Sequence, residues 1–194
     1  MDHESTSKWA TSIAIANDAL RNERVPLTLT PRLYRSLTLA ATVLRLGFDE
    51  RLAIAGMILD ATQSNALARS QAIESFGTEL VSIADCVNRW RPNLYASEDQ
   101  WTESCKRDLF ALSGLDESGT SLLLADRLID VREVSVGLRE GGRKFMKRYK
   151  ITPESIFTYY QTLSEEFLKK QLPGSEEFAG HGGDLEWIFS MKDA

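Results

Sequence analysis

The run from Leu52 to Ala61 (LAIAGMILDA) is apolar on every side except at Asp60. A run of this length that is apolar all round predicts a helix at the centre of a small protein rather than a strand. The run from Leu122 to Ala125 repeats the pattern and leads directly into Asp126 and Arg127. A buried carboxylate costs free energy unless hydrogen-bond donors or a metal ion satisfy it, so the question of function starts with these two aspartates.

The remaining sequence predicts helices throughout, because no stretch alternates apolar and polar residues as a half-buried strand does. Helix starts are expected at Thr30-Pro31, Asp49, Ser97 with Gln100, and Thr152-Pro153, where capping residues precede apolar periodicity. The predicted fold class is an all-α helical bundle of about eight helices.

Two helices carry more specific expectations. In the helix after Pro31, the spacing predicts a buried face made of Leu33, Leu37, Ala40, Ala41 and Leu44. The helix that begins at Leu122 is expected to end at the Gly141-Gly142 pair.

The chain is expected to form one domain over residues 1–194, with its core over 5–172 and a C-terminal tail over 173–194. The glycine-rich segment from Phe178 to Gly183 is expected to be loose, with residues from Leu185 onward docking as a short helical turn. Cys86 on an apolar helix face is expected to be buried, and Cys105 in a polar setting to be more exposed.

Charge and hydropathy limit the kinds of partner that the chain is expected to have. The net charge of −5 argues against a general nucleic-acid binder. No stretch reaches the roughly 18 to 20 apolar residues that a membrane span needs. Two cysteines without paired spacing are typical of reduced thiols, and the N-terminus does not resemble a signal peptide, so a cytoplasmic location is expected.

Three stretches together resemble the HD-domain phosphohydrolases, in particular the alarmone (ppGpp) hydrolase branch of Rel/Spo-type proteins and small alarmone hydrolases. They are Leu39–Asn65, Ala72–Trp90 and Leu122–Val134. The last, LLLADRLIDVREV, is the most specific, since it resembles the family's LADRLHNMR helix. The resemblance implies an HD-domain-like fold.

The resemblance also implies a metal centre, because the family holds a divalent ion with two histidines and two aspartates and uses it to activate water. It places the first histidine at Thr30, the His-Asp pair at Leu59-Asp60 and the last aspartate at Asp126. Neither Thr30 nor Leu59 offers an imidazole nitrogen. The chain's two histidines, His3 and His181, lie in its terminal segments.

Other positions of the family's site differ as well. The acidic pair assigned there to water attack corresponds to Gln63 and Ser64, and the substrate-contacting asparagine corresponds to Asp130. A basic loop before the first histidine corresponds to Arg21 and Arg24. Candidate substrate-binding residues are therefore Arg21, Arg24, Arg127 and Asp130. No catalytic residue is expected, because the positions of the two histidine ligands and of the acidic pair are occupied by other residue types.

Two interpretations of Asp60 and Asp126 stay open. In the favoured one, arginines such as Arg127, Arg132 and Arg45 pair with the carboxylates, and no cofactor is expected. In the other, the two aspartates form a weak site for Mg²⁺ or Mn²⁺.

Three functions follow. The first is a catalytically inactive HD-domain protein that binds a guanine nucleotide, a protein partner or a second copy of itself as a regulatory module. The second is a divergent metal-dependent phosphohydrolase acting through Asp60 and Asp126. The third is a protein-protein scaffold without a ligand site.

Overall fold

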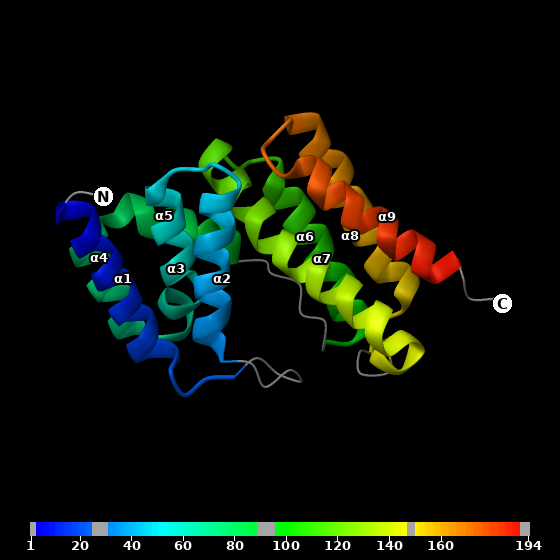
Figure 1. Ribbon diagram of the computed structural model, residues 1–194, viewed down its shortest axis with the longest axis horizontal. Coiled ribbons are helices and arrows are strands. Elements are labelled where there is room, and N and C mark those ends of the chain that lie inside the picture. Colours follow the sequence, from blue (N-terminus) through cyan, green and yellow to red (C-terminus); the bar gives the residue numbers. More distant parts are fainter. Residues whose placement is uncertain (1–2, 25–30, 89–95, 147–149, 191–194) are drawn as a thin grey trace. The chain divides into compact units, whose positions relative to one another are not determined.

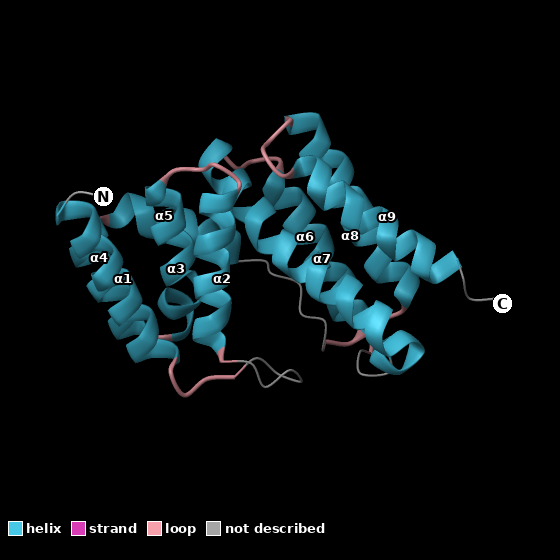
Figure 2. Ribbon diagram, in the orientation of Figure 1, coloured by secondary structure: helices cyan, strands magenta, loops and turns pink. Residues whose placement is uncertain are grey.

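The computed structural model describes residues 3–24, 31–88, 96–146 and 150–190. Within these ranges the chain is helical, and the only extended pairing is an isolated bridge between Arg24 and Pro31 (Figures 1 and 2). The helices of the described ranges are α1 (His3–Leu20), α2 (Arg32–Arg45), α3 (Glu50–Ser64), α4 (Ala66–Phe76), α5 (Thr78–Asn88), α6 (Glu98–Leu112), α7 (Glu117–Met146), α8 (Pro153–Lys170) and α9 (Ser175–Ser190). The prediction of an all-α helical fold is confirmed, while the likeness to HD domains stays a prediction.

The chain divides into two compact units. The first unit consists of residues 1–89 and 116–125, and the second of residues 90–115 and 126–194. Helix α7 therefore contributes its first residues to one unit and the rest to the other. The expectation of a single domain with a core over 5–172 stays a prediction.

Helix α3 is the centre of the first unit, where α1, α2, α4 and α5 all pack against it (Figure 1). Every residue from Leu52 to Thr62 is buried, as its apolar sequence predicts. Gly56 lets neighbouring side chains approach the helix closely. A Cβ atom there would lie 3.0 Å from Cγ of Leu39 and 3.4 Å from Cδ1 of Leu122.

Local capping chemistry sets most helix starts as expected. The carboxylate of Asp49 accepts a hydrogen bond from the backbone N–H of Leu52 at 2.7 Å. Ser97 and Gln100 form a reciprocal capping box at the start of α6. Thr152 caps α8, which has Pro153 in its first turn. The expected cap Thr30 lies outside the described residues, and Pro31 occupies the N-cap position of α2.

The predicted buried face of α2 is wrong for most of its residues. Leu37 and Leu44 are 42% and 46% exposed, and Ala41 is exposed too. The helix instead buries Ser36, Leu39, Ala40, Thr42 and Val43. Apolar residues make up more than half of the sequence of this helix, so more than one of its faces fits the apolar periodicity. Periodicity alone therefore does not predict which face packs against the core.

In the second unit, α9 packs against α8. The ring of Phe178 lies 5.1 Å from that of Phe167 and 6.2 Å from that of Tyr160, measured between centroids. The expected loose segment from Phe178 to Gly183 is thus wrong, because α9 runs unbroken from Ser175 to Ser190. Phe178 and Leu185, which share one face of the helix, are both fully buried, and this packing outweighs the low helix propensity of the glycines.

The expected helix end at Gly141-Gly142 is also wrong, since α7 continues to Met146. Glycines in this turn make room for the ring of Phe145. A Cβ atom at Gly137 would lie 2.1 Å from Cε2 of Phe145, and one at Gly141 would lie 3.0 Å from its Cβ. Gly137 and Gly141 therefore serve packing rather than chain termination.

None of the described helices combines the length and apolar character that crossing a bilayer requires.

Candidate functional site

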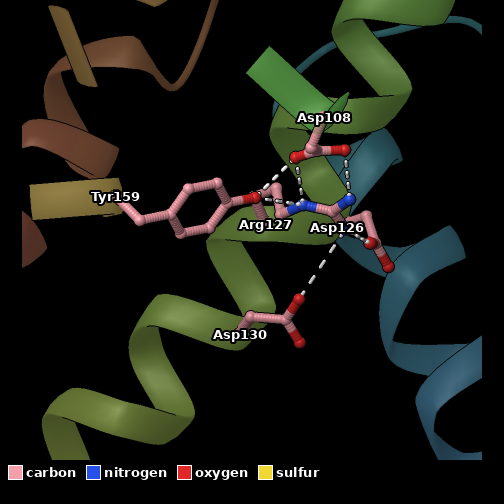
Figure 3. A network of polar contacts seen from close by, with 5 residues as sticks. All are labelled: Asp108, Asp126, Arg127, Asp130 and Tyr159. Atoms are coloured by element: carbon pink, nitrogen blue, oxygen red, sulfur yellow. Dashed lines mark hydrogen bonds and ion pairs between the residues drawn. The ribbon is translucent and has the colours of Figure 1, made fainter. Parts of the chain in front are cut away.

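Helix α7 carries Asp126, Arg127 and Asp130 in the second unit. Figure 3 shows the guanidinium of Arg127 at the centre of a group of polar side chains from three helices. Asp108 joins from α6 and Tyr159 from α8. We call these five residues the Arg127 network: Asp108, Asp126, Arg127, Asp130 and Tyr159.

All three nitrogens of the Arg127 guanidinium donate hydrogen bonds to neighbouring side chains. Its Nη2 donates to Oδ1 of Asp108 at 2.8 Å and its Nε to Oδ2 at 3.1 Å, which makes a bidentate pair. The same Nε lies 3.0 Å from the Tyr159 hydroxyl, and that hydroxyl donates to Oδ2 of Asp108. The Nη1 group donates to Oδ2 of Asp126 and lies 3.8 Å from Oδ2 of Asp130.

The network is buried almost completely. The side chains of Arg127 and Asp126 are each 1% exposed and that of Asp108 is 3% exposed, whereas Asp130 at 21% reaches solvent. Tyr159 is buried as well, and its ring meets that of Trp101 edge-on at 5.4 Å. Charges buried to this degree persist only when they are paired and hydrogen-bonded, as they are here.

Burial opposes the charge on Arg127, but Asp108, Tyr159 and Asp126 outweigh it and raise the pKa of the guanidinium well above its ordinary value. For Tyr159, burial raises the pKa of the phenol well above its ordinary value, although the positive charge of Arg127 acts in the opposite direction. The network is therefore held with a charged arginine and a neutral tyrosine.

Sequence reasoning missed Asp108 and Tyr159. The signal for Asp108 was its position on a helix face with Trp101, Cys105 and Leu112, all of which are buried at helical spacing. The same face explains why the cysteine prediction is wrong. Cys105 is buried and Cys86 is exposed. Burial raises the pKa of the Cys105 thiol, with Asp108 adding to the effect.

The other predicted site residues lie in the first unit. Leu59 and Asp60 are buried in α3, at 1% and 4% exposure, while Gln63 and Ser64 are exposed at its end. The Ser64 hydroxyl donates to the Asp60 carbonyl oxygen at 2.9 Å, so it completes the last turn of the helix. Asp60 belongs to the first unit and Asp126 to the second.

The candidate arginines differ in their settings. Arg21 and Arg24 are both exposed beyond the end of α1, and Arg24 donates to the Glu23 carbonyl oxygen at 3.4 Å. Of the arginines expected to pair with the buried aspartates, Arg127 holds Asp126. Arg132 pairs with Glu177, and Arg45 is exposed in the last turn of α2.

The donor atoms do not fit the metal centre that the resemblance implies. Leu59 has no donor atom, and one oxygen of Asp126 is engaged by a guanidinium. His181 lies on α9, with its Nδ1 3.7 Å from Oδ2 of Asp184. Within the part of the chain that the structure describes, no three His, Cys, Asp or Glu side chains gather as a metal site would require.

Comparisons with known proteins place the fold alone. No protein-family description matches the chain, and a search of curated proteins finds no match. Among solved structures, the chain is similar to the crystal structure of lmo0812 from Listeria monocytogenes EGD-e, with a TM-score of 0.62 and 19% identity. The similarity covers 80% of this chain and 99% of that chain, which supports the all-α fold.

Proposed function

We propose that this chain is a non-hydrolysing relative of the HD-domain phosphohydrolases that acts as a regulatory or interaction module. One observation carries the proposal. The carboxylate that would be the last metal ligand, Asp126, is bonded to Arg127 inside a buried network that joins α6, α7 and α8.

The pairing matters because a metal ligand needs both a free lone pair and a negative potential at the ion. A guanidinium that is hydrogen-bonded to the carboxylate competes with the ion for the lone pair, and its positive charge reduces the negative potential at the ion. A leucine at the position of the dyad histidine removes a further donor, and oxygen donors alone favour weakly held ions such as Mg²⁺ over the transition metals that imidazole selects.

The contacts of Arg127 also bear on substrate binding. Its Nε, Nη1 and Nη2 all donate to groups within the network, and its side chain is 1% exposed. These contacts favour a structural role over contact with a nucleotide phosphate. A protein partner is therefore the better candidate ligand for the module, and a guanine nucleotide would depend on Arg21 and Arg24 in the first unit.

The test combines turnover, metal content and binding. Purified protein incubated with Mn²⁺ and ppGpp should release no pyrophosphate above a blank, and should retain no stoichiometric manganese after dialysis. A nucleotide that binds should raise the thermal midpoint, since saturation at about 100 times its dissociation constant adds about 2.7 kcal/mol of stability.

Two isosteric variants separate the alternatives. If the chain is a divergent hydrolase, Asp60→Asn and Asp126→Asn should each abolish turnover while the circular dichroism spectrum stays native. Measurable Mn²⁺-dependent release of pyrophosphate that both substitutions remove would overturn the proposal.

A further inference from the structure

Helix α9 is joined to α7 by ion pairs within the second unit, where Figure 1 shows both helices. Arg132 pairs with Glu177, and Arg139 pairs with Asp184. These pairs are seven positions apart on each helix and occur in the same order, so α7 and α9 run in the same direction here. We call these four residues, together with His181, the α7–α9 seam. The paired side chains are 31–53% exposed, so neither pair adds much stability by itself.

His181 lies between the two ion pairs on α9. It follows Glu177 by four positions and precedes Asp184 by three, so the three side chains share one face of the helix. The side chain is 26% exposed, yet its Nδ1 atom is buried and has no hydrogen-bond partner among the described residues. Buried polar atoms are rarely left unpaired, so this nitrogen calls for an explanation.

The acceptor nearest to this nitrogen is already in use. Nδ1 of His181 lies 3.7 Å from Oδ2 of Asp184, which is too far for a hydrogen bond. The same oxygen accepts a hydrogen bond from Nη2 of Arg139 across the seam. A proton on Nδ1 makes the imidazole a cation with an N–H to donate. His181 and Arg139 then compete for one carboxylate oxygen.

The surroundings of His181 disfavour a positive charge on its ring. Burial lowers the pKa of the imidazole, and the charges of Arg132 and Arg139 lower it further, although Asp184 opposes them. The ring is thus held neutral in the folded seam at pH values near 6.5 and just below, where a solvated histidine already takes up protons. A proton therefore costs the closed seam more than a loosened one in which the ring meets water.

Helix α8 also packs against α9, and it does so through uncharged side chains. The rings of Tyr160 and Phe167 meet that of Phe178. The buried residues of α8, a helix described throughout, include the phenols of Tyr159 and Tyr160 but no Asp, Glu, Lys or Arg. An ordinary phenol ionises near pH 10, and ordinary carboxylates and guanidiniums stay charged between about pH 5 and 7. His181 is thus the member of the seam whose charge changes in that range.

We infer that His181 is a pH-sensitive switch: when its Nδ1 takes up a proton, it captures Asp184 from Arg139, so a pair between two helices gives way to a pair within α9, and α9 loosens from α7. The inference goes beyond the proposed function, because it concerns the attachment of α9 and does not depend on nucleotide turnover.

The direction of the switch follows from linkage. A histidine whose folded-state pKa is lowered stabilises the folded state fully above its unfolded pKa of about 6.5. That stability is lost as the pH falls from the unfolded value toward the folded one, because the loosened state binds the proton more tightly. The attachment of α9 should therefore weaken in acid.

Hydrogen exchange of the full chain measures this attachment directly. After correction for the intrinsic rate, amides of α9 in the wild type should lose protection between about pH 7 and pH 5. The loss should be at most about tenfold per pH unit, because a single proton is taken up. His181→Gln, whose side chain stays neutral, should keep the same protection across the range. Helix α5 in the first unit is the internal reference, and its protection should stay constant in both proteins.

An NMR titration of the His181 ring tests the exchange of partners. Arg139→Gln removes a repelling charge and the competitor for Asp184, so it should raise the pKa of His181, whereas Asp184→Asn should lower it further. The matched control is Arg107→Gln on α6, because the side chain of Arg107 is 52% exposed and that of Arg139 is 53% exposed, and each pairs with one carboxylate. This control should leave the pKa of His181 unchanged.

The results that would overturn the inference are distinct. Loss of α9 protection in acid that persists in His181→Gln would assign the titrating group elsewhere, and protection of α9 that is constant in the wild type would mean that no switch operates. Equal loss in α5 would show that the proton acts on the whole fold. A His181 pKa that does not respond to Arg139→Gln would remove the competition for Asp184. This last comparison retains the imidazole, so it decides the question even if His181→Gln does not fold, with His3→Gln then supplying the assignment of the ring signals.

Discussion

The carboxylate of Glu98 accepts a hydrogen bond of 2.7 Å from the backbone N–H of Thr152, 54 positions away in the chain. Glu98 is the first residue of α6, and it also accepts hydrogen bonds from the hydroxyls of Thr152 and Ser155 at the start of α8. One carboxylate thus supplies acceptors to the N-terminal turn of another helix, where unpaired N–H groups favour negative charge.

Acid should weaken this junction. The hydrogen bond from Ser155 lowers the pKa of Glu98, against the opposing effect of burial. A carboxylate with a lowered folded-state pKa adds stability above its unfolded pKa of about 4.3, and that stability is lost as pH falls through the folded value. Glu98→Gln should therefore lower the free energy of unfolding at pH 7, and the gap to the wild type should close in acid. Urea denaturation at both pH values measures it, and a gap that persists undiminished in acid contradicts the assignment.

Arg127→Met should be severely destabilising. It leaves Asp108 and Asp126 buried without their cation, and breaking a buried ion pair from one side costs about 3–5 kcal/mol. The matched control is Arg107→Met on α6, whose ion pair with Glu103 is 52% and 54% exposed. Its loss should cost no more than about 0.5 kcal/mol. Guanidinium denaturation of both variants tests the difference, and similar small losses would mean that the Arg127 network is not a structural element.

Tyr159 should resist ionisation until the chain unfolds. Burial raises the pKa of its phenol, so the neutral form favours the folded state. That stability is complete below the unfolded pKa of about 10 and is lost as pH rises beyond it. Ultraviolet phenolate absorbance should show Tyr159 ionising together with loss of helicity, and the amplitude of this step should fall in Tyr159→Phe. The substitution should itself cost about 1–3 kcal/mol, because Asp108 and Arg127 each lose a buried partner.

Gly56→Ala and Gly180→Ala should shift stability in opposite directions. Both glycines lie within helices, where alanine is intrinsically better by about 1 kcal/mol. A Cβ at Gly56 would lie 3.0 Å from Cγ of Leu39, a side chain that is itself 1% exposed within the core. Overpacking there costs about 1–3 kcal/mol. A Cβ at Gly180 meets nothing within 4 Å. Thermal unfolding should show Gly56→Ala below and Gly180→Ala above the wild type, and a stabilised Gly56→Ala would show that Leu39 has room to shift.

The parts of the fold that sequence predicts well are those set by local chemistry. Asp49, the Ser97–Gln100 pair and Thr152 cap helices as expected, because each bond closes within three residues. The continuous burial of α3 also follows directly from its sequence. No tertiary information is needed for either.

The failures share a different origin. On α2 two apolar faces compete, and only packing against α3 decides that Leu39 and Val43 are the buried ones. Glycines predicted an end to α7 and a loose α9, yet Phe145 and Phe178 supply the contacts that outweigh propensity.

The residues of the candidate site also fall into those that the sequence predicts and those that it does not. Arg127 is one of the arginines expected to pair with the buried aspartates, because arginine is the usual partner of a buried carboxylate, and it does pair with Asp126. Asp108 and Tyr159 lie 19 and 32 positions from Arg127, so nothing local marks them as its partners. Only the stripe that Asp108 shares with Trp101 and Leu112 indicated that its side chain turns inward.

The boundary between the two compact units falls between Ala125 and Asp126, inside a continuous helix rather than in a loop. Ala125 is fully buried, as is Leu128 on the other side of that boundary. A cut in the gene there would separate residues 126–194 from α6, which belongs to the same unit and whose Asp108 pairs with Arg127. Because each unit is built from two separate stretches of sequence, no single cut can divide the gene into the two units.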